Sequence, residues 1–352
     1  MSDQASRLRE AVEAEPAVFA TESRPGPLSI RPRRETELHG AVTLTSPRGP
    51  IERPRGLLAG DRIAAAPSPP PRLARAIAVA SGKGGVGKTS IAASLSIAIA
   101  CRRRETWLVD ADLGMGNVDV ACGFTPRWTL GDVMVGRCRL EEAFTTVESG
   151  LPLRALAAGS GVAGLAAMPA GGRDRLLRLL AEAESEADEL IVDCGAGVGA
   201  TTLGFAAAAH EVLLVATPEP ASMVDAYGLL KCLLARRPAA RVSLVVNQAE
   251  GPDEAAAVHR RLDGVARGHL GRSLPLLGVV PRDESVRRAA RLRRPVLLAD
   301  PSAPASRAVA QIADRLLGMS DPVAVSPPSQ PAEADREPGG FLGRVAGWLT
   351  RR

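Results

Sequence analysis

A glycine-rich segment with two lysines, Gly82-Lys-Gly-Gly-Val-Gly-Lys-Thr89, has the residue types and spacing of a phosphate-binding loop. It fits the pattern G-x-x-x-x-G-K-[ST], in which glycines let backbone N–H groups point inward around a β-phosphate. The loop follows an apolar run and precedes a helical pattern from Ser90 to about Cys101, whose dipole adds positive potential. We therefore expect Lys88 to reach the β- and γ-phosphates and the Thr89 hydroxyl to bind Mg²⁺. The alternative is a glycine-rich turn without a chemical role.

Carboxylates end two of the apolar runs that we expect to be strands. Asp110 ends the run from Trp107, and Asp112 comes two residues later, so both side chains share one side of the chain. Asp193 ends a second run that begins at Leu190. Aspartates at strand ends either bind ligands or cap the helices that follow, and a neighbouring phosphate loop favours the first role.

The segment from about residue 75 to residue 318 alternates short apolar runs with helical patterns. This alternation indicates an α/β domain with a mostly parallel sheet and helices on both faces. Each run ends in, or is soon followed by, glycine, proline, aspartate or asparagine, so ligand-binding loops are expected along one edge of the sheet. The expected strands are Ile77 to Ala80, Trp107 to Asp110, Leu190 to Asp193, Val212 to Ala216, Val242 to Asn247 and Leu276 to Val280.

The loop and the carboxylates together resemble those of the MinD/ParA family, which are P-loop NTPases of the SIMIBI class. In that family the early lysine of the loop reaches across a dimer to the partner's nucleotide, and the resemblance gives this role to Lys83. Two lysines cannot easily share one set of phosphates, because the ammonium groups of Lys83 and Lys88 would repel each other. A solvated surface lysine is the other interpretation. The resemblance implies an ATP hydrolase that converts ATP and water to ADP and phosphate, with ATP and Mg²⁺ bound between two chains of a homodimer.

The same resemblance implies roles for the remaining site residues. Asp112 becomes the switch residue that orients the attacking water, Asp110 lies beside the magnesium shell, and Asp193 holds Mg²⁺ through water. No histidine or glutamate in the motifs offers a strong base, so slow turnover is expected. The catalytic residues are then Lys83, Lys88 and Asp112, and the metal-associated residues are Thr89, Asp110 and Asp193. The nucleotide-binding residues are Gly82, Lys83, Gly84, Gly85, Val86, Gly87, Lys88, Thr89 and Ser90, with Asn247, Pro281 and Asp283 near the base, although Asn and Pro-x-Asp are also ordinary turn residues.

Further stretches resemble the FlhG (FleN) group of flagellar-number regulators within the MinD-like ATPases. They are Asp110-Ala-Asp-Leu-Gly, Asp193-Cys-Gly-Ala-Gly, Thr217-Pro-Glu-Pro, Val245-Val-Asn247 and Pro281-Arg-Asp283, and the match covers about residues 75 to 318. The segment Asp3-Gln-Ala-Ser-Arg-Leu-Arg9 resembles the element through which that group activates the signal-recognition-type GTPase FlhF. The resemblance implies a regulator of flagellar number or placement, with an FlhF-type GTPase bound at residues 3–9 and basal-body components as further partners. The chain departs from the group's pattern at two places. Cys194 stands where threonine or serine is more usual, and the linker before the loop is long.

Both ends of the chain differ in composition from the middle. Residues 1–15 have a helical pattern, and residues 16–74 are rich in proline and arginine without periodicity, which predicts a helix on a disordered linker. The resemblance implies that this helix is the GTPase activator. A second proline-rich linker at 319–339 leads to residues 340–352. There the residues on one side of a helix are Phe341, Leu342, Val345, Ala346, Trp348 and Leu349. This tail resembles the membrane-targeting helix of the MinD group, and the alternative is that its apolar face packs back on the ATPase domain.

Charge and composition limit the location and the partners. A net charge of +5 and a pI of about 9.3 indicate contact with nucleic acid or with the inner face of a membrane. The arginines gather between about residues 24 and 75 and at the C-terminus, so no basic face is expected in the middle of the chain. No apolar run reaches the roughly 20 residues that span a bilayer. We expect a cytoplasmic protein that associates reversibly with the anionic inner membrane through residues 340–352, without a specific nucleic-acid partner.

Other functions stay open for such a chain. A MinD-type division-site ATPase shares the fold, the dimer and the tail, but does not account for the stretch at residues 3–9 or for Thr217-Pro-Glu-Pro. A ParA-type partition ATPase suits the basic pI and predicts salt-dependent binding to non-specific DNA, but leaves the apolar tail unexplained. An iron-sulfur carrier is disfavoured because the five cysteines show no C-x-x-C spacing. A non-enzymatic scaffold is disfavoured because the loop lysines and the strand-end aspartates are all present.

Overall fold

The computed structural model describes residues 73–112, 116–159, 184, 186–319, 340–341 and 344–345. Four expected segments lie wholly or mostly outside the described residues: the activator helix at 1–15, the linkers at 16–74 and 319–339, and the tail at 340–352. Within the described part of the chain, no helix is both long enough and apolar enough to cross a bilayer.

In the described residues, eight strands form one sheet in the order β3-β4-β2-β5-β1-β6-β7-β8. All neighbouring pairs are parallel except β3 and β4, which are antiparallel. The strands are β1 (Arg75–Ser81), β2 (Thr106–Ala111), β3 (Thr145–Thr146), β4 (Leu153–Leu156), β5 (Glu189–Ala196), β6 (Glu211–Ala216), β7 (Val242–Ala249) and β8 (Leu276–Pro281). Because β1 lies between β5 and β6, the loop that follows it leaves from the middle of the sheet.

The expected α/β fold with a mostly parallel sheet is confirmed, and so are the six expected strands, each within three residues of its expected ends. β3 and β4 are additions at the edge of the sheet. Two residues in β3 and four in β4 are too few to give a periodic signal in the sequence.

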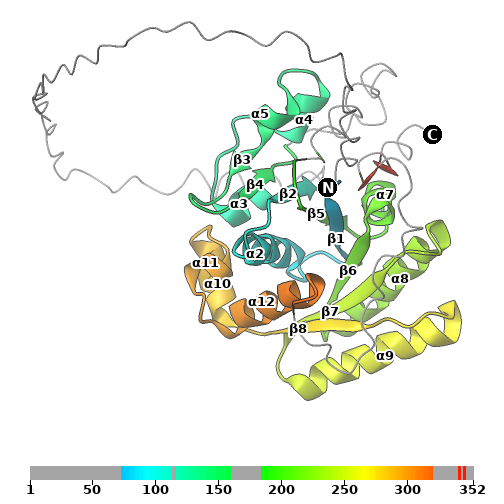
Figure 1. Cartoon of the computed structure of the whole chain (residues 1–352). Coiled ribbons are helices and arrows are strands. Elements are labelled where there is room, and N and C mark those ends of the chain that lie inside the picture. The colour runs from blue at the N-terminus through cyan, green and yellow to red at the C-terminus, as the bar shows by residue number, and fades with distance from the viewer. Residues whose placement is uncertain are drawn as a thin grey trace, which may run out of the picture. The chain divides into compact units, whose positions relative to one another are not determined.

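Helices cover both faces of the sheet (Figure 1). One face carries α2 (Lys88–Ala100), α10 (Glu284–Arg291), α11 (Val296–Ala299) and α12 (Pro304–Leu316), and the other carries α7 (Ala200–Ala208), α8 (Pro220–Arg236) and α9 (Pro252–Leu270). The short helices α3 (Val118–Cys122), α4 (Leu130–Met134) and α5 (Leu140–Ala143) lie beside β2, β3 and β4. Proline occupies the first turn of α8, α9 and α12, where its missing N–H group leaves no helical hydrogen bond unmade.

The core lies on both faces of the sheet because alternate residues of each strand point to opposite sides. In β1, Ile77 and Val79 pack in the cluster that contains α2 and α12. Ala76, Ala78 and Ala80 pack in the cluster that contains α7, α8 and α9. All five side chains are fully buried, as expected for a strand at the centre of a doubly covered sheet. The carboxyl ends of the strands are thereby held in fixed positions along one edge.

Candidate nucleotide site

The glycine loop joins the end of β1 to α2, as the sequence predicts. A methyl group at Gly82 would lie 2.0 Å from the backbone oxygen of Asp225 in α8, so no larger residue fits there. Gly87 caps α2 with a positive φ of 86°, a conformation that glycine adopts without strain. Gly84 and Gly85 face open space, with no atom within 4 Å of an added methyl group. The backbone at Gly84 and Gly85 therefore borders open space, which a phosphate chain can enter.

Lys88 lies inside this loop and not on the surface. It is 8% exposed, and its Nζ donates to Oδ1 of Asp193 at 2.6 Å. Burial raises the pKa of Asp193, while the charge of Lys88 and hydrogen bonds from Lys88 and Thr89 oppose that rise. The structure thus brings together three predicted site residues from β5 and the start of α2. Ser90 follows in the first turn of α2, which contains no acidic residue that would repel a phosphate.

Asp110 and Asp193 are direct neighbours across β2 and β5, where their Cα atoms pair in register. Both carboxylates are 1% exposed. Asp110 accepts hydrogen bonds from the backbone N–H groups of Asp112 and Val118, each at 3.1 Å. Burial raises the pKa of Asp110 to about 7, the two backbone donors lower it, and the nearby Asp193 charge raises it. Two adjacent carboxylates at one sheet edge make a site that favours a cation.

Asp112 lies at the same edge, close to the loop that follows β5. A methyl group at Gly195, near the end of β5, would lie 3.5 Å from Cγ of Asp112, which is ordinary van der Waals contact, so the Asp112 side chain lies beside this strand end. Cys194 is fully buried in the core, and burial raises its pKa to about 12. The cysteine is an inert core side chain, and its departure from the family pattern changes packing and not reactivity.

The residues expected near the base meet at the ends of β7 and β8. Asn247 is 7% exposed, and its Nδ2 donates to the backbone oxygen of Val86 in the glycine loop at 2.7 Å. Asp283 uses its carboxylate differently: Oδ1 accepts from Ser285 N at 2.8 Å and Oδ2 accepts from Ala305 N at 3.0 Å. Its side chain therefore caps α10 and holds the start of α12. A base near Pro281 would meet the backbone of this loop and not the Asp283 carboxylate.

Lys83 is oriented unlike Lys88. Its Nζ lies 2.6 Å from Oε1 of Glu219, and the two side chains are 35% and 56% exposed. Glu219 precedes α8 and was absent from the predicted site residues, although it belongs to the stretch Thr217-Pro-Glu-Pro that carries part of the resemblance. Two apolar side chains nearby are also exposed: Val224 in α8 at 70%, and Val198 after β5 at 50%.

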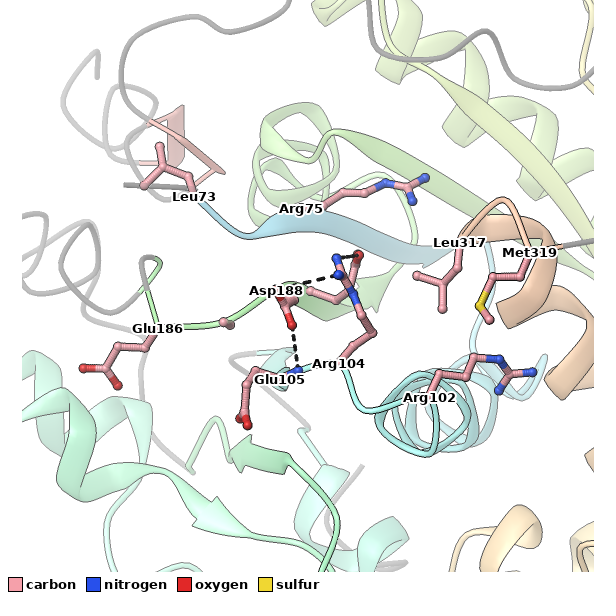
Figure 2. Close-up of a pocket in the computed structure, with 11 residues that line it drawn as sticks. Leu73, Arg75, Arg102, Arg104, Glu105, Glu186, Asp188, Leu317 and Met319 are labelled. Atoms are coloured by element: carbon pink, nitrogen blue, oxygen red, sulfur yellow. Dashed lines mark hydrogen bonds and ion pairs between the residues drawn. The ribbon is translucent and has the colours of Figure 1, made fainter. Parts of the chain in front are cut away.

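A cavity of about 740 Å³ lies at the opposite edge of the sheet, where β1, β2 and β5 begin (Figure 2). Its arginines already have acidic partners. Arg104 lies 3.2 Å from Glu189 and 3.8 Å from Asp188, and Arg75 lies 2.6 Å from Glu211. Burial raises the pKa of Glu189, and the two arginines oppose the rise. This cluster fixes the amino ends of the strands and lies away from the glycine loop.

The described part of the tail packs against α7. Phe341 and Val345 are 1% and 2% exposed, and the ring centroid of Phe341 lies 6.4 Å from that of Phe205. The N–H group of Phe341 donates to Oε1 of Glu184 at 2.7 Å, and Arg344 Nε donates to Ala208 O at 2.6 Å. Two residues of the expected membrane-facing side are therefore buried in the domain in this conformation.

The donor set fits a Mg²⁺-bound nucleotide phosphate chain. The open glycine edge and the amino end of α2 supply N–H groups, and Lys88 supplies a cation. The Thr89 hydroxyl and the Asp193 carboxylate are oxygen ligands of the kind that Mg²⁺ prefers.

Comparisons with known proteins agree with this geometry. Residues 77–296 match the CobQ/CobB/MinD/ParA nucleotide binding domain. The chain is 38% identical to the antiactivator FleN of Pseudomonas aeruginosa over 65% of this chain and 81% of FleN. It is 29% identical to the flagellum site-determining protein YlxH of Helicobacter pylori over 69% of this chain and 82% of that protein.

Among solved structures, MinD of Pyrococcus horikoshii complexed with Mg-ADP superposes with a TM-score of 0.58 and 23% identity, covering 71% of this chain and all of that one. This likeness concerns the fold. Together with the matched domain, it shows that the chain belongs to the CobQ/CobB/MinD/ParA nucleotide-binding family, with a MinD-like P-loop fold and flagellar regulators among its relatives.

Proposed function

We propose that this chain is a slow ATPase switch that dimerises with ATP, associates with the inner membrane and regulates the number or placement of flagella. The relatives FleN and YlxH support the flagellar role, and the MinD-like fold supports nucleotide-dependent switching. The single observation that carries the switch is the orientation of Lys83, which points out of its own loop to an exposed carboxylate.

The geometry of the two loop lysines favours contact between two chains. Lys88 lies inside the loop beside Asp193 and is the cation available to the phosphates of its own site. Lys83 forms an exposed pair with Glu219, and such pairs contribute only about 0–1 kcal/mol. A partner's phosphates, with more negative charge than one carboxylate, would displace Glu219. Lys83 then links two chains only while a triphosphate is bound.

The surface beside Lys83 suits a second copy of the chain. Val198 and Val224 are exposed beside the glycine loop. Val198 follows Gly197, whose N–H group donates to the backbone oxygen of Ser81. Val224 precedes Asp225, whose backbone oxygen lies close to Gly82. Isolated exposed valines are common, but two beside a charged site favour a covered face. Dimerisation would bury both side chains.

Hydrolysis in this proposal depends on Asp112. In the switch role its carboxylate, beside Gly195 and the loop after β5, orients a water molecule toward the γ-phosphate. Asp110 holds the backbone of Asp112 through a hydrogen bond and so fixes the start of this loop. Bound Mg²⁺ would neutralise phosphate charge, held by Thr89 directly and by Asp193 through water. Because an aspartate that orients water is a weak base, turnover is slow.

Membrane association through residues 340–352 requires that the tail leave α7. Phe341 and Val345 cannot be buried against Phe205 and inserted in a bilayer at the same time. One tail binds a membrane weakly, whereas two tails on a dimer gain avidity of up to roughly 10² to 10⁴ over a single tail. Location thus follows nucleotide state, with dimers on the membrane and monomers in the cytosol.

The proposed contact with an FlhF-type GTPase rests on the sequence of residues 3–9, which lie outside the described residues. It is tested by deleting residues 1–15 and measuring stimulation of the GTPase. Unchanged stimulation would remove the activator role and leave the ATP switch standing.

Co-sedimentation with anionic vesicles tests the switch. The full chain should pellet with vesicles in ATP and Mg²⁺ and stay in the supernatant in ADP and Mg²⁺. Equal distribution in the two nucleotides would contradict the proposal.

A further inference from the structure

Five exposed arginines lie between residues 287 and 294, in α10 and the turn that follows it. Arg287, Arg288 and Arg291 share the solvent side of α10, while Ser285 and Ala289 on its other side are buried. Arg293 and Arg294 extend the same charge into the turn. The five residues Arg287, Arg288, Arg291, Arg293 and Arg294 are called the α10 arginine face. The expectation of no basic face in the middle of the chain is wrong, because these arginines belong to one short run that α10 and its turn expose to solvent.

Most of this charge is not neutralised by the domain. Arg287 lies 3.6 Å from Glu284, and Arg294 lies 3.4 Å from Glu148. Within the described residues, no carboxylate lies within ion-pair distance of Arg288, Arg291 or Arg293. Basic residues in the last turn of a helix favour its dipole, which accounts for Arg288 and Arg291 but not for the two arginines beyond it. Arg288 also donates to Ser285 Oγ at 2.7 Å, so internal contacts involve Arg287, Arg288 and Arg294, whereas Arg291 and Arg293 have no ion-pair partner among the described residues.

An exposed apolar side chain adjoins this face. Leu292 closes α10 and is 72% exposed, with an arginine on each side of it in the sequence. The turn that presents it is held by hydrogen bonds from Arg293 N to Ala290 O and from Arg294 N to Ala289 O. The backbone oxygen of Arg293 also packs against Gly123 at the end of α3, where a methyl group would lie 2.2 Å away. Leu292 is thus held outward by a fixed turn.

We propose that the α10 arginine face and Leu292 form a second membrane contact, which binds an anionic lipid bilayer alongside the tail. This inference rests on the membrane association proposed above and adds a contact that belongs to the folded domain. Guanidinium groups would pair with lipid phosphates, and Leu292 would enter the boundary between headgroups and acyl chains.

Leu292 favours a bilayer over nucleic acid as the partner. A duplex would accept the arginines at its phosphates but would offer the leucine no apolar surface. A bilayer takes up both, because apolar and cationic side chains together bind the interface of anionic membranes. Each basic residue near an anionic surface tightens binding by about fivefold at room temperature.

The tail and the α10 arginine face can act on the same membrane. The docked tail lies on α7, and α10 lies on the other face of the sheet (Figure 1). The chain from residue 320 to residue 339 has 20 residues, whose extended length is at most roughly 70 Å. Once Phe341 and Val345 leave α7, this length allows the tail to enter a bilayer well away from α7.

Vesicle co-sedimentation of the full chain in ATP and Mg²⁺ tests the proposal. The vesicles contain either phosphatidylglycerol with phosphatidylcholine or phosphatidylcholine alone. The test proteins are Arg287→Glu/Arg291→Glu and Leu292→Ser. The matched control is Arg260→Glu/Arg261→Glu, which makes the same charge change at two exposed arginines of α9. Circular dichroism and ATP binding check that each variant folds.

Removing two basic contacts, each worth about fivefold, predicts that the α10 double variant binds anionic vesicles at least about 25-fold more weakly than wild type. Leu292→Ser should bind roughly tenfold more weakly. The α9 control should bind anionic vesicles like wild type. On vesicles of phosphatidylcholine alone, the α10 variants and wild type should not differ in binding.

Four results would overturn the proposal. If the two double variants lose binding equally, only net charge matters. If the α10 variants bind vesicles like wild type but lose salt-dependent binding to duplex DNA, the face binds nucleic acid. If wild type itself does not bind anionic vesicles in ATP, the proposed membrane function fails together with this contact. If wild type binds and the α10 variants bind equally well, only the α10 contact is ruled out.

Discussion

Lys83 and Glu219 form an exposed ion pair at the mouth of the glycine loop, with Nζ 2.6 Å from Oε1. The two residues are 136 positions apart in the sequence, so β1 and β6, adjacent in the sheet, bring them together. In the proposed switch this pair belongs to the monomer, and dimerisation replaces Glu219 by the partner's phosphates.

Glu219→Gln should favour the dimer. Breaking this pair costs at most about 1 kcal/mol per chain, so removing the competing carboxylate should tighten the ATP-bound dimer by up to about 30-fold. Analytical ultracentrifugation over a range of protein concentrations measures the change. Glu186→Gln, which alters a glutamate of similar exposure that is paired with Arg154, should leave the dimer unchanged. A weaker dimer in Glu219→Gln would show that Glu219 does not compete for Lys83.

Lys88→Met should destabilise the nucleotide-free domain as well as abolish nucleotide binding. The change leaves the Asp193 carboxylate without its cation in a site where it is 1% exposed, and breaking such a buried pair costs about 3–5 kcal/mol. Adding Asp193→Asn removes the unpaired charge and should restore most of that stability without restoring binding. Urea denaturation measures both. Equal unfolding midpoints for the single and double variants would contradict the assigned pair.

Because of His210, the free energy of unfolding should fall as the pH drops below the pKa of an ordinary histidine. Burial first, and then the charge of nearby arginines led by Arg344, lower the pKa of His210 to about 4. An unfolded histidine has a pKa of about 6.5, so the unfolded chain takes up the proton first. The stability attached to neutral His210 is complete above about pH 6.5 and is lost as the pH falls toward 4.

His210→Asn tests this contribution. The asparagine oxygen can replace Nδ1, which accepts the N–H group of Ala76 at 2.8 Å, and it does not titrate. Between about pH 7 and pH 5 the melting temperature of wild type should therefore fall more steeply than that of the variant. Parallel curves would show that His210 does not supply the pH dependence.

Phe205→Ala and Phe341→Ala should affect membrane binding in opposite ways. Phe205 belongs only to the docked state, so its loss weakens docking and should raise the fraction of protein on vesicles in ADP. Phe341 belongs to both states, so its loss should lower binding in ATP. Vesicle co-sedimentation in the two nucleotides separates the effects. A decrease for both variants would mean that the docked tail does not compete with the membrane.

The central strands and the loop could be predicted because their signals are local. Gly82 to Thr89 carries its motif within eight residues, and the aspartates at residues 110 and 193 end apolar runs. Their convergence follows from parallel pairing, which places Asp110 opposite Asp193. β3 and β4 could not be predicted, because short edge strands have too few residues for a periodic pattern.

Contacts that depend on tertiary structure could not be predicted from the sequence. The pattern of residues 340–352 predicts an apolar face but cannot say what covers it, and the structure places Phe341 and Val345 against α7. The Pro-x-Asp turn predicts a place near the base for Asp283, yet its carboxylate caps α10. Glu219 lay in a recognised stretch, but only the fold shows that it meets Lys83.

Sedimentation velocity of Asp112→Ala protein in ATP and Mg²⁺ tests the central claim most directly. Slowed hydrolysis should hold this protein as a dimer in ATP and leave it a monomer in ADP. The Lys83→Ala/Asp112→Ala protein should bind ATP and stay monomeric. A monomeric Asp112→Ala protein in ATP, or a dimer that forms equally well without Lys83, would contradict an ATP switch that joins two chains through this lysine.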